Sequence, residues 1–279
     1  MSSTVLSLGA PEITDVEFGL LRDLIHAKTG IALKDSKRAL VSGRLVKRLR
    51  DLGLESYSEY YRILQNSDPG GVEMRQMINC ITTNKTSFFR EEAHFPVLAD
   101  HFRAAVRRGQ TAYRIWSAAC SSGEEPYSIA MTLLPESRSY DVRILASDID
   151  TDVLAQAEDG LYPLESLEAL EMPVKRRFFL KGRGECEGLA HIKPEVKELV
   201  QFRRINLIED AWPIHTKFDA IFCRNVIIYF DRATQRRLFE RLSGLLSRDG
   251  LLFVGHSETL YWLNDLLVPV RHSVYRTRP

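Results

Sequence analysis

Apolar residues recur at helical spacing through the first third of the chain, and no strand pattern interrupts them. Four helices are expected there, and the second of them covers roughly residues 36–52. Gly30, Gly53 and the turn sequence at 67–71 indicate three helix ends. We therefore predict an all-helical domain over residues 1–86. The apolar faces of its helices are Phe18, Leu21, Leu24 and Ile25; Val41, Leu45, Leu49 and Leu52; Tyr57, Tyr60, Tyr61 and Leu64; and Met74, Met77, Ile78 and Ile81.

The pattern changes after about residue 111, where short apolar runs alternate with helical stretches. Alternation of this kind implies a parallel sheet with helices on both faces. We therefore predict an α/β domain over residues 87–279. Its strands are expected at 113–119, 142–146, 200–203, 218–223, 251–255 and 273–277, and its helices at 126–134, 152–158 and 232–246.

One stretch of this second region does not fit the alternation. Residues 161–200 are too long for a simple connection and contain turn signals of their own. Two short runs, 177–181 and 189–192, flank the glycine turn at 182–184 and are typical of a β-hairpin. We predict a small antiparallel β subdomain inserted at about residues 170–200.

The strand at 218–223 is the most informative, because its apolar run is typical of a strand covered on both faces. Polar residues follow at its carboxyl end, and Asp231 is suited to cap the next helix. Ligands of open parallel sheets bind beyond the carboxyl ends of the strands. Arg224, Asn225 and Tyr229 are therefore candidate functional residues.

Composition excludes several classes of protein. The 279 residues are 44% hydrophobic and 27% charged with a net charge of +1, which describes a globular protein without a strong field of one sign. No apolar stretch approaches the roughly 20 residues that span a bilayer. Residues 1–11 lack the basic and apolar parts of a secretory signal. We expect a cytoplasmic protein that does not insert into membranes, and a monomer by default.

The cysteines and histidines predict no metal site. The four cysteines lie far apart and form no C-x-x-C pair, which argues against zinc ligation and against a disulfide framework. The seven histidines show no H-E-x-x-H or similar pattern. The cysteines are Cys80, Cys120, Cys186 and Cys223.

The loop after the first strand indicates which cofactor the sheet binds. Residues 117–127 contain one glycine, Gly123, where a dinucleotide site has G-x-G-x-x-G. Glu124 and Glu125 would repel phosphates but attract S-adenosylmethionine, which carries a sulfonium, an ammonium and no phosphate. Asp148, at the end of the second strand, is placed to bond ribose hydroxyls. The alternatives are that the glutamates complement a helix dipole and that the aspartate caps a turn.

Six segments, in this order and spacing, resemble the bacterial chemotaxis receptor glutamate methyltransferases, the CheR family. The resemblance covers nearly the whole chain. It implies a Rossmann-like class I S-adenosylmethionine methyltransferase sheet with an N-terminal helical domain and a small inserted antiparallel β subdomain. The segments are 82–91 (TTNKTSFFRE), 116–119 (WSAA), 123–128 (GEEPYS), 146–150 (ASDID), 222–230 (FCRNVIIYF) and 255–258 (GHSE).

The resemblance also implies which residues contact the cofactor. In this family the arm between the two domains folds over S-adenosylmethionine. From the sequence alone, Asn84 also fits a polar helix end and Asn206 a turn after a strand. The residues at matching positions are Asn84, Thr86, Arg90, Glu125, Asp148, Asn206, Leu207, Asn225 and Val226.

The implied reaction transfers a methyl group to a glutamate side chain of a membrane chemoreceptor, which gives a methyl ester and S-adenosylhomocysteine. Glutamate has a reference pKa of about 4.3 and is ionised at neutral pH, so no general base is needed. Alignment of the reacting atoms is the main catalytic requirement. We expect Arg90 and Tyr229 to orient groups without moving protons, although Tyr229 also fits aromatic packing beside Phe230. A rate that depends steeply on a group titrating between about pH 6 and 9 would contradict this expectation.

The helical region contains a candidate receptor-binding surface. Six basic residues and no acid lie between Lys37 and Arg50. Lys37, Arg44 and Arg48 share one stripe beside the apolar face of the expected helix. Receptor methylation regions are helical and rich in glutamate by family implication, so we hypothesise that this stripe binds an acidic helix. A solvated surface is the alternative.

The β subdomain is a second candidate contact with the receptor. In some family members its edge strand pairs with a peptide from the receptor C-terminus. Gly182 and Gly184 resemble the glycine turn of those members, while Glu185 stands where their pattern has proline. The sequence therefore leaves this partner open.

Two other functions share the predicted fold. A nucleic-acid methyltransferase could use the basic helix on phosphates. Residues 224–229, however, lack the Asn-Pro-Pro-Tyr type of loop that suits a base amine, and the net charge is near zero, so no nucleic-acid partner is expected. A regulatory module would bind S-adenosylmethionine without turnover.

Overall fold

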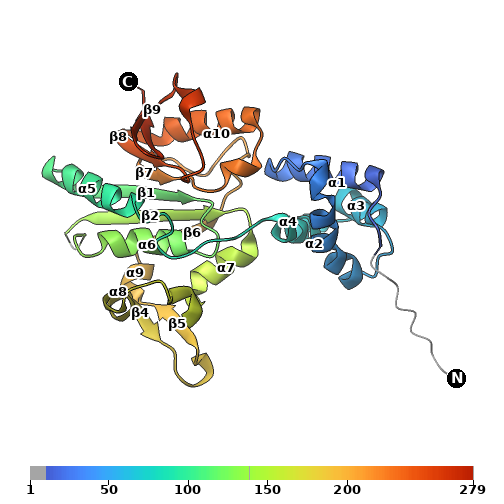
Figure 1. The fold of residues 1–279 in the computed structure, drawn as a ribbon, viewed down its shortest axis with the longest axis horizontal. Coiled ribbons are helices and arrows are strands. Elements are labelled where there is room, and N and C mark those ends of the chain that lie inside the picture. The colour runs from blue at the N-terminus through green and yellow to red at the C-terminus, as the bar shows by residue number, and fades with distance from the viewer. Residues whose placement is uncertain (1–10, 138, 279) are drawn as a thin grey trace. The chain divides into compact units, whose positions relative to one another are not determined.

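The computed structural model describes residues 11–137 and 139–278, and the chain divides between Thr83 and Asn84 into two compact units (Figure 1). The first unit is helical, as predicted. Each of the four helices expected from the apolar periodicity is present. They are α1 (Asp15–Thr29), α2 (Arg38–Asp51), α3 (Tyr57–Asn66) and α4 (Val72–Ile81).

Capping chemistry determines where the first helix begins and ends. The Thr14 side chain accepts the N–H of Glu17, and the Glu17 carboxylate accepts the N–H of Thr14, which is a capping box. Gly30, at φ 75°, ends α1 in the left-handed conformation. The N–H and the hydroxyl of Ser58 both donate to Glu17 at 2.8 Å. One carboxylate thus caps α1 and joins it to α3.

The second unit is built on a seven-stranded sheet with the order β6-β2-β1-β7-β8-β10-β9. The first five strands in that order run parallel, and β10 pairs antiparallel with β8 and β9. The strands are β1 (Ala112–Ala118), β2 (Asp141–Asp148), β6 (Val200–Arg204), β7 (Phe218–Phe222), β8 (Leu246–Phe253), β9 (Leu267–Arg271) and β10 (Val274–Thr277).

Helices lie on both sides of this sheet, as the alternation predicted, with α6 and α10 on opposite sides in Figure 1. The helices of the second unit are α5 (His94–Arg107), α6 (Glu124–Leu133), α7 (Thr151–Asp159), α8 (Met172–Phe178), α9 (Pro194–Lys197) and α10 (Arg232–Leu245). None of the helices in the described residues combines the length and the apolar content needed to cross a lipid bilayer.

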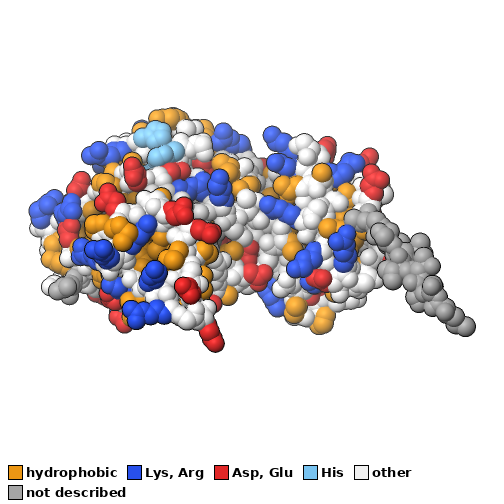
Figure 2. Space-filling model, turned by 60° about the horizontal axis from the view of Figure 1, so that its bottom comes forward, with side chains coloured by type: hydrophobic (Ala, Val, Ile, Leu, Met, Phe, Trp, Pro, Cys, Tyr) orange, Lys and Arg blue, Asp and Glu red, His pale blue; other side chains and the backbone are white. Residues whose placement is uncertain are grey.

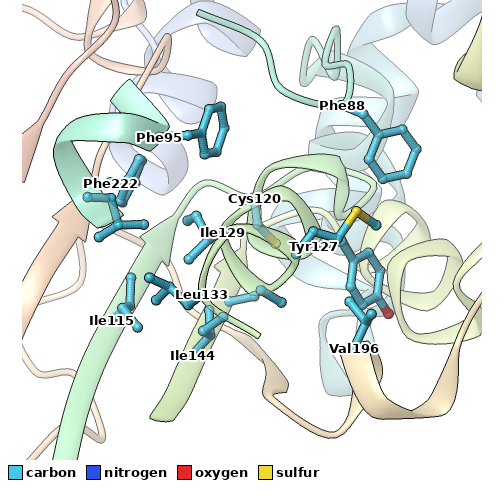
Figure 3. Close-up of a cluster of buried hydrophobic side chains, with 14 of the residues drawn as sticks. Phe88, Phe95, Ile115, Cys120, Tyr127, Ile129, Leu133, Ile144, Val196 and Phe222 are labelled. Atoms are coloured by element: carbon cyan, nitrogen blue, oxygen red, sulfur yellow. The ribbon is translucent and has the colours of Figure 1, made fainter. Parts of the chain in front are cut away.

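The core between α6 and the sheet positions the ends of the strands. Ile129 of α6 is fully buried, as are Ile115 of β1 and Phe222 of β7 (Figure 3). Full burial of one such side chain contributes about 1.5–3 kcal/mol. Because β7 lies between β1 and β8 and is buried at four of its five positions, the loop that follows it begins from a rigid base.

The inserted subdomain is a three-stranded antiparallel sheet with the order β3-β5-β4. Its strands are β3 (Leu161–Pro163), β4 (Phe179–Lys181) and β5 (Leu189–Ile192). The predicted hairpin is confirmed as β4 and β5, but two details of the prediction are wrong. The subdomain begins at β3 and not near residue 170, and residues 177–178 belong to α8.

Three further differences concern the main sheet and its flanking helices. No prediction covered α5 or β9, and β8 begins at Leu246, before Gly250. Pro96 lies in the first turn of α5, where its missing N–H costs no helical hydrogen bond. A helix was therefore compatible with this sequence.

Candidate functional site

The carboxyl ends of four adjacent strands meet at one edge of the main sheet. The registers pair Ala118 with Ser147, Ser117 with Phe222, and Phe222 with Phe253. The loops after β1, β2, β7 and β8 therefore leave the sheet side by side. Of the predicted residues, Asp148 ends β2, Glu125 lies in the first turn of α6 after the β1 loop, and Asn225 lies in the loop after β7.

A buried guanidinium joins two carboxylates at the edge. The Arg224 side chain is 2% exposed, and it bonds Glu125 Oε2 through Nη1 at 3.1 Å and Glu91 Oε2 through Nη2 at 2.9 Å. Its Nη2 also donates to the carbonyl oxygen of Arg90 at 2.6 Å. Ser117 Oγ donates to the other oxygen of Glu125 at 2.7 Å. The structure thus brings Arg224, the Glu91 and Glu125 carboxylates and the backbone of Arg90 into one ionic cluster.

The two carboxylates of this cluster titrate differently. Burial raises the pKa of Glu125, and the opposing charge of Arg224 does not fully offset it. Burial also raises the pKa of Glu91, but the Arg224 charge, the backbone N–H of His256 and further hydrogen bonds outweigh it and leave that pKa below its ordinary value. The Arg224 charge thus favours the ionised form of both carboxylates.

The loop between β1 and α6 is held tightly against Asp148. The N–H of Ser121 donates to Asp148 Oδ2 at 2.8 Å, and the N–H of Asp150 donates to Oδ1 at 3.0 Å. Burial raises the pKa of Asp148, and these bonds oppose that effect. Gly123 has φ 94°, and a Cβ there would lie 2.8 Å from Ala157 Cβ, so only glycine fits.

Residues 84–93 form an irregular segment, the arm, which is hydrogen-bonded to the loops at the edge. Asn84 Nδ2 donates to Asp150 Oδ2 at 2.7 Å, and Ser121 Oγ donates to the Asn84 carbonyl oxygen at 3.0 Å. The N–H of Phe89 donates to Ser128 Oγ at 2.9 Å. These bonds place Asn84 next to the loop that contains Asp150, the neighbour of Asp148.

The middle of the arm is strained and folded on itself. Phe89 and Glu91 have φ 53° and 56°, which costs of order 1–3 kcal/mol for each residue that is not glycine. Arg90 Nη1 donates to the Lys85 carbonyl oxygen at 2.8 Å and closes the arm around Thr86, which is half-buried. Strain of this kind persists only where surrounding contacts over-determine the backbone.

The side chain of Glu258 holds the loop after β7 in place. Its carboxylate accepts the N–H of Asn225 at 2.8 Å, of Ile227 at 3.1 Å and of Gly255 at 2.7 Å. Asn225 has φ 57°, and its Nδ2 donates to Glu91 Oε1 at 3.2 Å. Val226 is half-buried at the same turn. The side chain of Asn225 is thereby held toward the arm.

Replacing Gly255 with alanine tests this arrangement. The added Cβ would meet the Asn225 amide and lie 2.8 Å from Glu258 Oε2, so the loop must shift. We expect a loss of about 1–3 kcal/mol in the free energy of unfolding together with weaker cofactor binding. Gly244→Ala is the matched control, because a Cβ there meets no described atom within 4 Å. Chemical denaturation that shows equal stability for both variants would contradict this account.

The remaining predicted residues of the second unit lie farther along the edge. Asn206 and Leu207 follow β6 and are buried. The N–H of Ile208 donates to Asn206 Oδ1 at 3.2 Å, and Trp212 Nε1 donates to the Asn206 carbonyl oxygen at 3.0 Å. Tyr229 is half-buried in a 3-10 turn, Ile227–Tyr229, that continues the loop after β7.

Two of the three predicted receptor-binding residues have partners inside the first unit. Arg48 makes two bonds to the buried Glu73 carboxylate, Nε to Oε1 at 2.9 Å and Nη2 to Oε2 at 2.6 Å. Arg44 donates to the carbonyl oxygen of Ile81, which ends α4, and to that of Thr82. Lys37 is exposed. Both arginines therefore tie α2 to α4 and are not simple surface charges.

Sequence reasoning missed Glu91 and Glu258. Both stand inside segments that were singled out, directly after Arg90 and three residues after Gly255. The sequence signal that could have identified them is a carboxylate next to a predicted loop or strand end. The roles of Glu91 and Glu258 depend on which loops lie together in the folded chain, and a local sequence pattern does not contain that information.

Fold and site together define a class of protein. An open α/β sheet that presents acids, and no glycine-rich phosphate loop, at the ends of its first strands suits a cationic cofactor without phosphates. This is the arrangement of a class I S-adenosylmethionine-dependent methyltransferase. Residues 84–275 match the model of the CheR methyltransferase, SAM binding domain, and residues 16–82 match that of the CheR methyltransferase, all-alpha domain. The chain belongs to the CheR methyltransferase family.

Individual relatives agree with this assignment. The chain is 50% identical to chemotaxis protein methyltransferase 2 of Pseudomonas aeruginosa over 264 residues, which cover 94% of this chain and 93% of the relative. It is 46% identical to the chemotaxis protein methyltransferase of Escherichia coli, with 94% and 91% covered. The corresponding protein of Salmonella typhimurium is 46% identical, with 88% and 84% covered. The predicted family, fold class, enzyme class and cofactor are therefore confirmed.

Proposed function

We propose that this enzyme transfers the methyl group of S-adenosylmethionine to glutamate side chains in the cytoplasmic part of membrane chemoreceptors, and that it acts in the cytoplasm as a monomer. The products are glutamyl methyl esters and S-adenosylhomocysteine. The relatives named above are chemotaxis protein methyltransferases. The observation that carries the proposal is the pair of acids, the half-buried Glu125 and the buried Asp148, held at the edge of the sheet.

The residues at the edge fit this cofactor. A carboxylate has about four lone-pair sites, and the Asp148 carboxylate accepts backbone N–H groups from Ser121, Ile149 and Asp150. It can therefore accept a ribose hydroxyl as well. The half-buried Asn225 and Val226 lie at the turn that Glu258 holds. Asn84, on the arm, bonds Asp150 and Ser121 beside the loops after β2 and β1, and Thr86 follows two residues later on the arm. When bound, the cofactor supplies an electrophilic methyl group on a positively charged sulfur.

The charge distribution suits transfer to a carboxylate. Charges of opposite sign cancel as the transition state forms, so a strong cation on the substrate carboxylate would stabilise the ground state more. The buried charge of Arg224 is balanced by Glu91 and Glu125. Arg224 is therefore not available as a strong cation for the substrate carboxylate. Arg90, held by Lys85, and Tyr229 are proposed to orient the reacting groups, as a positional contribution to the rate.

Incubation with radiolabelled S-adenosylmethionine and receptor-containing membranes tests the function. We expect label in the receptor and its release as methanol in base, because methyl esters are base-labile. Binding of the cofactor without transfer would indicate a regulatory module instead.

Steeply salt-dependent retention of DNA or RNA would favour the nucleic-acid alternative. Figure 2 shows basic and acidic side chains interspersed on the visible face. This mixture gives no support to a broad phosphate-binding surface on that face.

Receptor recognition by the helical unit remains a proposal that now centres on Lys37. Lys37 is exposed next to α2. Arg48 is less suited to a charge reversal, because a glutamate at that position would place two carboxylates together at Glu73. We expect Lys37→Glu to raise the KM for the receptor by about threefold to tenfold, because it reverses one exposed charge. Cofactor affinity should stay unchanged.

A control on another helix separates this effect from general charge. Arg62, on α3, is exposed as well, and Arg62→Glu changes the net charge by the same amount. Steady-state methylation of receptor membranes is the measurement. Equal KM values for the two variants would refute the proposed surface.

The outer edge of β4 is a second proposed contact. In the three-stranded sheet β5 is central, so β4 leaves one edge available to an added strand. Gly184 has φ 60° and begins the turn after β4, and a Cβ on Gly182 would overlap the Cys186 carbonyl oxygen. These glycines keep the turn compact beside the edge. Calorimetric titration with receptor C-terminal peptides is expected to give 1:1 binding, and a titration without heat would remove the proposal.

A further inference from the structure

Glu91 of the ionic cluster lies close to two histidine side chains, one three residues later in the chain and one from the loop after β8. Glu91 belongs to the arm, His94 opens α5, and His256 follows β8. Glu91 Oε2 lies 3.8 Å from His94 Nδ1 and 4.0 Å from His256 Nε2. The three atoms all lie within 4.8 Å of one another. The backbone N–H of His256 also donates to the Glu91 carboxylate, which holds the two segments together.

His94 presents a buried nitrogen toward the other two groups. Its side chain is 2% exposed, and its Nδ1 has no hydrogen-bond partner among the described residues. Ser273 Oγ lies 2.8 Å from His94 Nε2 and donates to the His272 carbonyl oxygen at 2.8 Å. In the tautomer that donates through Nε2 to this hydroxyl, His94 keeps a lone pair on Nδ1.

A bare lone pair facing a carboxylate in a buried place is unfavourable unless a cation joins them. We propose that Glu91, His94 and His256 bind a divalent transition-metal ion of the zinc class. Two imidazoles and one carboxylate form a common ligand set for zinc, with a fourth position open to water. The site would join the arm to the loop after β8.

The geometry is close to what such an ion requires. Ion–ligand distances of about 2.0–2.2 Å place the ligand atoms roughly 3–4 Å apart, which the two distances from Glu91 already satisfy. Rotation of the His256 ring, whose side chain is 41% exposed, closes the third. The Ser273 hydroxyl, 2.8 Å from the far nitrogen of His94, can accept the ring N–H, as partners of metal-bound histidines do.

The neighbouring guanidinium opposes the ion but does not block it. Arg224 bonds the same oxygen of Glu91 from one side, through Nη2 at 2.9 Å and Nε at 3.3 Å, and a carboxylate oxygen has two lone pairs. One lone pair can face Arg224 while the other faces the ion. The opposing charge makes a moderate affinity the expectation.

Titration of the full-length protein with Co²⁺, followed by competition with Zn²⁺, tests the site. We expect one ion per chain, the visible absorption bands of four-coordinate cobalt, and a rise in the unfolding temperature with ion concentration. His256→Ala is expected to lower the affinity by at least about 100-fold. This side chain is partly exposed, so the variant should fold, which circular dichroism verifies.

His272→Ala is the matched control. The ring of His272 lies 5.3 Å from that of His256 and stands outside the proposed ligand set, so its removal should leave the affinity unchanged. The proposal is overturned if the wild-type protein binds no Co²⁺ at concentrations up to about 100 μM, a weak limit for a structural or catalytic site. It is also overturned if His256→Ala binds as tightly as the wild type, or if His272→Ala abolishes binding.

Discussion

Arg224→Met is expected to lower the free energy of unfolding of the second unit by about 3–5 kcal/mol, the cost of removing one partner from a buried ion pair. Glu91 and Glu125 would be left with uncompensated charge at 13% and 14% exposure. Their pKa values should rise, so the loss of stability grows as the pH increases from acid to neutral. The Arg90 carbonyl oxygen also loses its donor, and cofactor affinity should fall with the loosening of the arm.

Arg236→Met provides the control. Arg236 also bonds two acids, Glu240 and Asp265, but its side chain is 43% exposed, and exposed pairs contribute little. Urea denaturation of both variants is the measurement. If Arg224→Met is as stable as Arg236→Met, the buried cluster does not hold the edge together.

Asp148→Ala is expected to weaken S-adenosylmethionine binding by at least about 100-fold, or about 2.7 kcal/mol, because hydrogen bonds to a charged group are each worth about 1.5–3 kcal/mol. The variant loses the proposed bonds to ribose and also the acceptor for the Ser121 N–H. Calorimetric titration with the cofactor or its product measures the effect.

The other end of the same strand supplies a control. Asp141 begins β2 and is paired with Arg114 and Arg143 at the surface, far along the strand from the carboxyl edge. Asp141→Ala should bind the cofactor as the wild type does. Equal affinity for the Asp148 and Asp141 variants would place the ribose elsewhere.

Elements with strong periodicity were predictable from the sequence. The helices of the first unit and the strand at 218–222 appear where apolar spacing and glycine ends place them. Asp231 caps α10 through the N–H of Thr234, as its position before the helix indicated. Local propensity and tertiary packing agree at these places. Short edge strands such as β9, with charged and exposed residues, give weak signals because they bury little.

The candidate site was predictable only in part. Residues at strand ends were found because the carboxyl edge of a parallel sheet is a general site for ligands. The ionic cluster was not found, because Glu91 and Arg224 are separated by 133 positions and only the folded chain brings them together. The helical stripe shows the converse. Spacing put Arg44 and Arg48 on one face, but it did not reveal that Glu73 and the end of α4 already bind them.

Phe88 joins the arm to the inserted subdomain. Its ring packs edge-on against Tyr162 of β3 at 4.9 Å and Phe179 of β4 at 5.2 Å between centroids. A shortened enzyme that kept the seven-stranded sheet without the insertion would lose the two aromatic rings against which Phe88 packs. A smaller version of the enzyme must therefore keep the inserted subdomain or supply other apolar side chains that pack against Phe88.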